Sequence, residues 1–349
     1  MSANELTKEI AVRQDYGNAM KKLFKFYNTL PDPDPILIKT GKAFDSYRDL
    51  TTDPHLYANI QQRKAGIVGL ERKIEPTENS GTAGYIISHL QNELDIDNII
   101  TQMLNAPLYG FSVLEIVWET VRFNSSALLL PKKIEEKPQE WFTFGMNNEL
   151  LYQGESSAPQ AVPVDKFILI QNNATYLNPY GEKALSRCYY PVMFKRNGLE
   201  YWVNFTEKYG MPFIIGKQPR TTSESDSDTF LSQLQDISLS NAAVIPDDTS
   251  IEILSFPSGA SIDAYRTFLE FMNSEISKAV LTQTLTTELQ NRGSYAATET
   301  HKEMLSMLTR SDMKPVEKGM NRILNITGRL NGMHKPPGRF KFLPHSADL

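Results

Sequence analysis

Apolar side chains recur at steps of three and four residues in several stretches of the chain, the spacing of one face of an α-helix. A short first stretch within residues 20–27 is followed by three prolines in residues 31–35, which predict an extended joint after an N-terminal arm. The pair Asp53-Pro54 is a typical helix start. The apolar positions after it predict a helix that runs into a strand at Glu71–Ile74.

The first half of the chain mixes helices with strands. We expect a second helix over residues 82–106, ended by Pro107. Residues 111–121, 141–153 and 164–172 are rich in β-branched and aromatic side chains and predict strands. Residues 1–180 are therefore expected to form an α+β region.

Two long helices flank a small unit in the second half. The first, from about residue 181 to 209, has one apolar face, made of Leu185, Cys188, Val192, Leu199, Trp202, Phe205 and Tyr209. Pro191 and Gly198 are expected to bend or weaken it. A strand–helix–strand unit follows, and then a second helix from Ile262 to about Leu285, about 36 Å long. A polar loop precedes a third helix, from about Glu299 to Leu330, and Pro336-Pro337 is expected to close the structured part.

Composition places the chain among globular proteins. Its 349 residues are 40% hydrophobic and 22% charged, enough for two or three domains. A single cysteine, Cys188, excludes an intrachain disulfide and a multi-thiolate metal site, and fits a reducing compartment. We expect no signal peptide and no membrane span, because the most apolar stretch, residues 103–118, is interrupted by Asn105, Pro107 and Glu115.

Charge is unevenly distributed. The net charge of −5 gives no general positive field for nucleic acid. Thr221–Glu252 contains seven acidic residues and no basic one. This acidic island is either a solubilising loop, a protein-docking surface or a lining that repels nucleic acid. Arg310–Lys341 contains eight basic and two acidic residues.

The third helix carries a basic stripe of four residues at four-residue spacing: Arg310, Lys314, Lys318 and Arg322. It is either a solvated face or a contact for a phosphate backbone or an acidic neighbour. The five histidines are scattered, and no dinucleotide, P-loop or nucleophile-elbow motif is complete. We therefore predict no catalytic residue, no metal site and no cofactor, and we interpret most strand and helix aromatics as core.

The order of two long helices, a small strand–helix–strand unit and a polar loop resembles the stem, clip, stem and tunnel loop of tailed-bacteriophage portal proteins. The sequence resembles more narrowly the portal family of Mu-like phages and prophages. Five stretches between about residues 50 and 305 carry this resemblance: LTTDPHLYANIQQRKAGIVGLERKI, APLYGFSVLEIVWE, NPYGEKALSRCYYPVMFKRNGLEYWVNFTEKYGMPFIIGK, AAVIPDDTSIE, and EISKAVLTQTLTTE with GSYAATETHKEM. Thr282 stands where this family leads us to expect a glycine, and no extended C-terminal crown precedes Leu349.

The resemblance implies an α+β portal-type fold with an α/β wing, long stem helices and a small α/β clip. It implies a homo-oligomeric ring, normally dodecameric, at one capsid vertex, which is the channel for packaging and ejection of double-stranded DNA and hydrolyses nothing itself. The implied partners are the terminase large subunit, the major capsid protein and neck or adaptor proteins, with no membrane. The implied location is the virion, after assembly in the bacterial host cytoplasm.

By position, the resemblance assigns an N-terminal arm (1–35), a wing (36–180), a stem helix (181–209), a clip (211–257), a second stem helix (258–285), a tunnel loop (286–294) and a wing or crown-proximal helix with a C-terminal tail (295–349). The residues expected to face DNA are Gln283, Thr286, Thr287, Gln290, Asn291 and Arg292. Those expected to dock terminase are Glu224, Asp226, Asp228 and Asp236. Two alternatives stay open: a ring-shaped head–tail adaptor and a nucleic-acid-processing enzyme. Such an enzyme would need clustered carboxylates to bind metal ions.

Overall fold

The structure is a computed structural model, and it describes residues 29–40, 44–78, 80–153, 159–209, 213–217, 223, 225–232, 250–254, 258–284 and 295–343. The chain divides into two compact units, whose boundaries fall inside its two long central helices. Unit 1 comprises residues 1–189 and 276–349, and unit 2 comprises residues 190–275.

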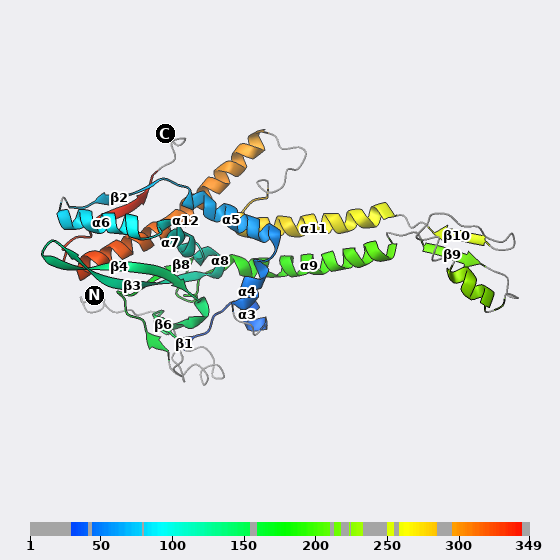
Figure 1. Ribbon diagram of the computed structural model, residues 1–349, viewed down its shortest axis with the longest axis horizontal. Coiled ribbons are helices and arrows are strands. Elements are labelled where there is room, and N and C mark those ends of the chain that lie inside the picture. The colour runs from blue at the N-terminus through cyan, green and yellow to red at the C-terminus, as the bar shows by residue number, and fades with distance from the viewer. Residues whose placement is uncertain are drawn as a thin grey trace, which may run out of the picture. The chain divides into compact units, whose positions relative to one another are not determined.

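Unit 1 combines helices with three small antiparallel sheets (Figure 1). Its helices are α3 (Pro35–Thr40), α4 (Asp45–Leu50), α5 (Pro54–Val68), α6 (Gly81–Glu93), α7 (Ile96–Met103), α8 (Ala106–Tyr109), the short 3-10 helix η1 (Gln139–Trp141) and α12 (Tyr295–Leu330). Its strands are β1 (Thr29–Leu30), β2 (Arg72–Pro76), β3 (Phe111–Phe123), β4 (Ser126–Lys137), β5 (Phe142–Gly145), β6 (Leu150–Tyr152), β7 (Gln160–Ala161), β8 (Phe167–Gln171) and β11 (Gly338–Phe342). The strand orders are β4-β3-β8, β1-β5-β6-β7 and β11-β2. This mixture confirms the α+β class.

The β3–β4 hairpin lies at the centre of the unit 1 core. Its two-residue turn contains Asn124 at a φ of 53°, a left-handed backbone that asparagine tolerates. Leu114, Ile116 and Leu130 are completely buried against α6, α7 and α12. The sheet therefore fixes the position of α12, the helix that carries the basic stripe.

The N-terminal boundaries of α5 and α7 follow from their capping residues, and that of α8 from the position of its proline. Asp53 accepts hydrogen bonds from the backbone N–H groups of His55 and Leu56, which confirms the predicted start of α5. The single helix predicted over residues 82–106 is wrong, because the backbone is extended at the end of α6 and Asp95 caps a new helix, α7. Pro107 does not end a helix but lies in the first turn of α8, where its missing N–H costs no hydrogen bond.

The sequence pattern did not predict strands β4 and β11. In β4, the pairing with β3 skips Lys132, and the resulting bulge accommodates Pro131 within the ladder. Strand β11 begins directly after Pro336-Pro337, so the expectation that these prolines close the structure is wrong. Its partner is β2, with Phe340 opposite Ile74, and a pairing across so long a stretch of chain leaves no local signal.

The proline-rich joint does more than separate two segments. Residues 31–34 have no regular structure, but the last of its three prolines begins α3, and Asp34 accepts a hydrogen bond from the N–H of Ile36. Lys183, just before α9, forms an ion pair with Asp32 at 2.8 Å. The joint is thereby tied to the beginning of a long helix. Residues 1–28 of the expected arm lie outside the described residues.

Unit 2 contains most of two long helices and a small strand–helix–strand unit. Helix α9 (Ala184–Tyr209) continues through Pro191 and Gly198. Helix α11 (Ser258–Leu281) both starts and ends four residues earlier than the helix expected from Ile262 to about Leu285. Within unit 2 the two helices pack antiparallel, because Gly198 lies against Phe268 while Trp202, further along α9, stacks on Tyr265. Strands β9 (Phe213–Lys217) and β10 (Ser250–Leu254) pair antiparallel, and residues 225–232 are helical between them.

Candidate interaction surfaces

The four residues of the basic stripe are all exposed on α12. Successive members lie four residues apart, so the stripe extends about 18 Å along the helix and winds about 120° around it. The opposite side of the helix is buried, with Val316, Ile323 and Leu324 each 1% exposed. The predicted stripe is therefore a continuous surface feature of unit 1.

Three sets of contacts hold α12 in the orientation that exposes the stripe. Glu317 and Asn321, one turn apart, accept hydrogen bonds from the backbone N–H groups of Phe342 and Phe340 and so cover the free edge of β11. Gly319 lets the helix approach β8, because a Cβ there would lie 2.6 Å from Ile170. The third contact is a buried ion pair.

That ion pair joins Arg63 of α5 to Asp312 of α12. The Arg63 Nε and Nη2 atoms lie 2.6 and 3.0 Å from the two carboxylate oxygens, and the side chains are only 12% and 6% exposed. Arg63 also donates to the carbonyl of Val280, near the end of α11. The Arg63 guanidinium thus connects α5 with the end of α11 and with α12.

The exposed face of α12 lacks negative charge over the length of the stripe. Between residues 310 and 325 the exposed side chains are Arg310, Ser311, Lys314, Lys318, Arg322 and Asn325. The two acids in this span are engaged elsewhere, Asp312 with Arg63 and Glu317 with β11. The face therefore presents only cations and small polar groups.

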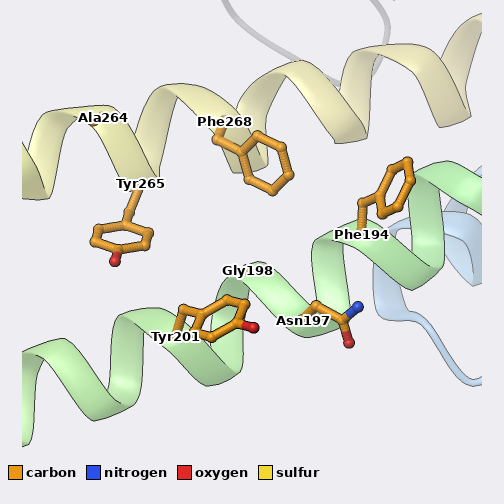
Figure 2. A pocket seen from close by; sticks show the side chains of 7 residues that line it. All are labelled: Phe194, Asn197, Gly198, Tyr201, Ala264, Tyr265 and Phe268. Carbon is orange, nitrogen blue, oxygen red and sulfur yellow. The ribbon is translucent and has the colours of Figure 1, made fainter.

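A second surface, in unit 2, is an aromatic groove between α9 and α11. It has a volume of about 420 Å³ and is lined by Phe194, Asn197, Gly198, Tyr201, Ala264, Tyr265 and Phe268 (Figure 2). Phe194 and Tyr201 are 51% and 66% exposed, and nearby Phe271 is 56% exposed. So many exposed aromatic rings on one helix pair are typical of a surface that another chain covers.

The composition of this groove differs from the sequence prediction. The aromatics of α9 were interpreted as core. On its predicted apolar face Leu185, Cys188 and Val192 are each 0% exposed, but Leu199 is 40% exposed. The groove residues Phe194 and Tyr201, which lie outside that face, are 51% and 66% exposed. Spacing identifies an apolar position without showing whether the same chain covers it. Gly198, expected only to weaken the helix, permits close packing, because a Cβ would meet the Phe268 ring at 2.7 Å.

Two of the four expected docking residues of the acidic island are described. Asp226 and Asp228 are exposed on the helical residues 225–232, which Ser223 caps by accepting from the N–H of Asp226. Glu224 and Asp236 lie outside the described residues. The structure thus presents two exposed carboxylates of the island at a helix surface, with Leu231 beside them 55% exposed.

The residues expected to face DNA separate into two groups. Thr286, Thr287, Gln290, Asn291 and Arg292 lie outside the described residues. Gln283 is only 4% exposed, so its expected place on a channel surface is wrong within this chain. Thr282, the residue before it, follows the end of α11 with a φ of 60°. That left-handed backbone explains why a glycine is expected at position 282.

Unit 1 contains a buried network of polar side chains that the sequence did not predict. Lys64 donates to Asn105 at 2.6 Å, Asn105 donates to Glu136, and Gln139 donates to the other oxygen of Glu136 at 2.8 Å. Burial raises the pKa of the Glu136 carboxyl and lowers that of the Lys64 ammonium. Because the residues lie on separate elements, the network joins α5, the α7–α8 junction and β4.

Other chemistry is limited in the part of the chain that the structure describes. No group of three histidine, cysteine or acidic side chains is arranged to hold a metal ion there. No helix among those residues has the length and apolar character needed to cross a membrane. Burial raises the pKa of the Cys188 thiol to about 12.

Comparison with known proteins gives consistent matches. A family model described as the portal protein of Mu bacteriophage matches residues 44–349. The chain is 23% identical over 279 residues to the portal protein of Escherichia phage Mu, covering 78% of this chain and 54% of that protein. It is 22% identical over 282 residues to the Mu-like prophage FluMu protein gp29 of Haemophilus influenzae, covering 78% and 53%. The chain thus spans about half the length of the curated relatives it matches.

Solved structures share the fold at low sequence identity. A chain in the neck of an empty GTA particle with C6 symmetry aligns with a TM-score of 0.64 at 9% identity, over 90% of this chain and 85% of that one. A chain in the virion of the native gene transfer agent particle aligns with a TM-score of 0.61 at 8% identity, over 87% and 84%. These similarities extend across both units.

Proposed function

The chain belongs to the portal proteins of Mu-like bacteriophages, and from that membership we propose that copies of it form a closed ring at one vertex of a phage capsid. Double-stranded DNA would pass through the ring during packaging and ejection. The ring would act as a structural channel, while a separate terminase motor supplies the energy. The protein's place would be the virion, after assembly in the host cytoplasm.

The observation that carries this proposal is the aromatic groove of unit 2. Burying an apolar surface yields roughly 25 cal/mol per Å² removed from water, so half-exposed aromatic rings favour association with another chain. Seven large apolar side chains on α9 and α11 are exposed: Tyr190, Phe194, Leu199, Tyr201, Val203, Phe268 and Phe271. In a ring, each copy meets two neighbours through different faces, so one such groove per copy is repeated around the whole assembly.

The portal architecture assigns roles to the parts of the chain. Residues 36–180 and α12 would form the wing, α9 and α11 the stem, and residues 211–257 the clip. Residues 286–294 would form the tunnel loop, where the neutral polar side chains of Thr286, Thr287, Gln290 and Asn291 allow DNA to slide without strong phosphate pairing. Arg292 is the exception to that neutrality.

The acidic island gives the clip its proposed partners. Asp226 and Asp228 on residues 225–232, with Glu224 and Asp236 nearby in the sequence, would attract basic surfaces of the terminase large subunit and later of neck or adaptor proteins. Contact with the major capsid protein would fall to the wing. A ring-shaped head–tail adaptor stays as the second candidate, and a DNA-packaging assay separates it from a portal.

The experiment that tests ring formation compares two pairs of substitutions. Tyr201→Gln with Phe271→Gln changes the groove, where the parent side chains are 66% and 56% exposed. Ile38→Gln with Leu177→Gln is the matched control in unit 1, where the parent side chains are 67% and 64% exposed. Both pairs leave the buried core of the chain unchanged.

Sedimentation velocity at several protein concentrations gives the result. We expect the parent and the control to sediment as one large species and the groove variant to shift toward subunits. A parent that remains monomeric or dimeric at every concentration and salt would refute the ring. Rings in the groove variant as stable as those of the parent would refute the role of the groove.

A further inference from the structure

The basic stripe places four exposed cations on α12, and no exposed acidic side chain lies among them between residues 310 and 325. Elsewhere, exposed cations commonly have carboxylate partners within 4 Å: Arg48, Arg72, Lys73, Lys133, Lys166, Arg187, Arg266 and Arg329. For Lys314, Lys318 and Arg322 the structure gives no ion pair among the described residues. Three such cations at four-residue spacing on one helix, Lys314, Lys318 and Arg322, favour a partner that brings the negative charge.

We propose that the basic stripe of α12, formed by Arg310, Lys314, Lys318 and Arg322, binds the phosphate backbone of double-stranded DNA. The inference rests on the proposed function, which brings duplex DNA to this protein, and it goes further by assigning the binding site. The stripe would hold DNA through charge, while the tunnel loop lets it slide.

The chemistry of the face favours phosphate over a protein partner. Protein interfaces take most of their affinity from aromatic and apolar anchors at their centre. Between residues 310 and 325 the exposed side chains of α12 include no such anchor, only the four cations, Ser311 and Asn325. Lys, Arg, Ser and Asn are the side chains that contact phosphate oxygens in protein–DNA complexes.

The same face favours duplex over single-stranded nucleic acid. Proteins that bind single strands stack exposed bases on aromatic rings. The stripe has none, and its exposed aromatic counterpart in this chain is the separate groove of unit 2. A row about 18 Å long is comparable to the axial rise of about five base pairs of duplex DNA at 3.4 Å per step.

Rigid support makes the stripe a defined site. The helix beneath it is fixed by the Arg63–Asp312 ion pair, by the hydrogen bonds of Glu317 and Asn321 to β11, and by the close packing of Gly319. The charged atoms stay mobile, but the positions from which they extend are fixed. Sequence-independent contact by flexible cations on a rigid helix suits a molecule that must move.

The test measures binding of a fluorescein-labelled 30-base-pair duplex of random sequence by anisotropy at several salt concentrations between 50 and 200 mM. Three full-length proteins are compared: the parent, a stripe variant in which Arg310, Lys314, Lys318 and Arg322 are all changed to Gln, and a control variant. The control changes Lys73, Lys133, Lys166 and Arg266 to Gln. Those four cations are 47–64% exposed and ion-paired. Because each variant loses four positive charges, the control and the stripe variant have the same net charge.

We expect the stripe variant to lose both affinity and salt dependence. Each phosphate contact contributes a slope of about 0.9 to the plot of log affinity against log salt, so four contacts make the parent slope steeper by about 3.6. The parent should then lose about 100-fold more affinity than the stripe variant between 50 and 200 mM salt. A single Lys318→Gln change should reduce the slope by about 1.

Native mass spectrometry of the same samples separates this inference from the proposed function. Rings in the stripe variant with a reduced slope support both. Equal slopes for parent and stripe variant, or an equal loss in the control variant, overturn the phosphate site. Stripe variants that lose their rings but bind the duplex like the parent point to an acidic surface of a neighbouring copy and also overturn it. A parent without rings refutes the proposed function, while the slope comparison still decides the inference.

Discussion

The buried ion pair between Arg63 and Asp312 should be a sensitive point of unit 1. Replacing Asp312 with Leu leaves the Arg63 guanidinium inside the protein without a counter-charge, and replacing Arg63 with Met leaves the Asp312 carboxylate in the same state. Their side chains are only 12% and 6% exposed, so water cannot compensate for the lost partner. Each single change should therefore reduce the free energy of unfolding by about 3–5 kcal/mol.

The double variant separates the ion pair from simple loss of packing. Removing both charges leaves no buried ion, so Arg63→Met with Asp312→Leu should cost far less than the sum of the two single changes. What remains is the unpaired carbonyl of Val280, which loses its hydrogen bond from Arg63, at about 1–3 kcal/mol. The expected coupling between the two positions is therefore several kcal/mol.

Urea unfolding followed by circular dichroism, at one fixed protein concentration, gives the four free energies of this cycle. The exposed pair Arg329–Asp165, whose side chains are 62% and 41% exposed, is the control, and Arg329→Met should cost at most about 1 kcal/mol. High salt should weaken the control pair but leave the buried one unchanged. Additive single changes at Arg63 and Asp312 would show that the ion pair does not act as a unit.

Three further predictions concern single positions. Thr282→Gly should raise the free energy of unfolding by about 0.5–1 kcal/mol, because the left-handed backbone at a φ of 60° strains a β-branched residue. Thr282→Ala should give no gain, and equal effects of the two changes in thermal unfolding would contradict this reasoning. Gly198→Val should destabilise the packing of α9 on α11 by about 1–3 kcal/mol, because a Cβ there meets Phe268 at 2.7 Å. Gly84→Ala in α6, where nothing lies within 4 Å of the added Cβ, should be neutral or stabilising. A Gly198→Val protein as stable as the parent in urea unfolding would refute the close packing. Cys188, buried and with a pKa of about 12, should resist iodoacetamide at pH 8.5 until urea unfolds unit 1, and rapid labelling of the native protein, measured by mass spectrometry, would contradict its burial.

The sequence predicted the features that depend on near neighbours. The stripe on α12 and the start of α5 at Asp53 follow from spacings of two to four residues, and the structure confirms the helices that carry them. The order of long helix, strand–helix–strand unit and long helix was also predictable, because each element has its own periodicity. The family itself was indicated by the resemblance of five sequence stretches to portal proteins of Mu-like phages.

The remaining features depend on contacts between distant parts of the chain. Arg63 and Asp312 lie 249 positions apart, and β11 pairs with a strand near the beginning of unit 1, so neither leaves a local pattern. The aromatics of α9 were interpreted as core, because the residue type alone does not show whether its own chain or another covers a ring. Gln283 was expected on a surface, and the residues next to it in the sequence give no sign that it is buried.

The central claim is that this chain builds a closed ring, and native mass spectrometry of the purified protein tests it most directly. Twelve subunits of 39.5 kDa give about 474 kDa, and we expect one dominant species at that mass or at a neighbouring whole number of subunits. Negative-stain images of the same sample should show rings with a central hole. A sample that contains only monomers and dimers over the whole range of concentration and salt would contradict the claim.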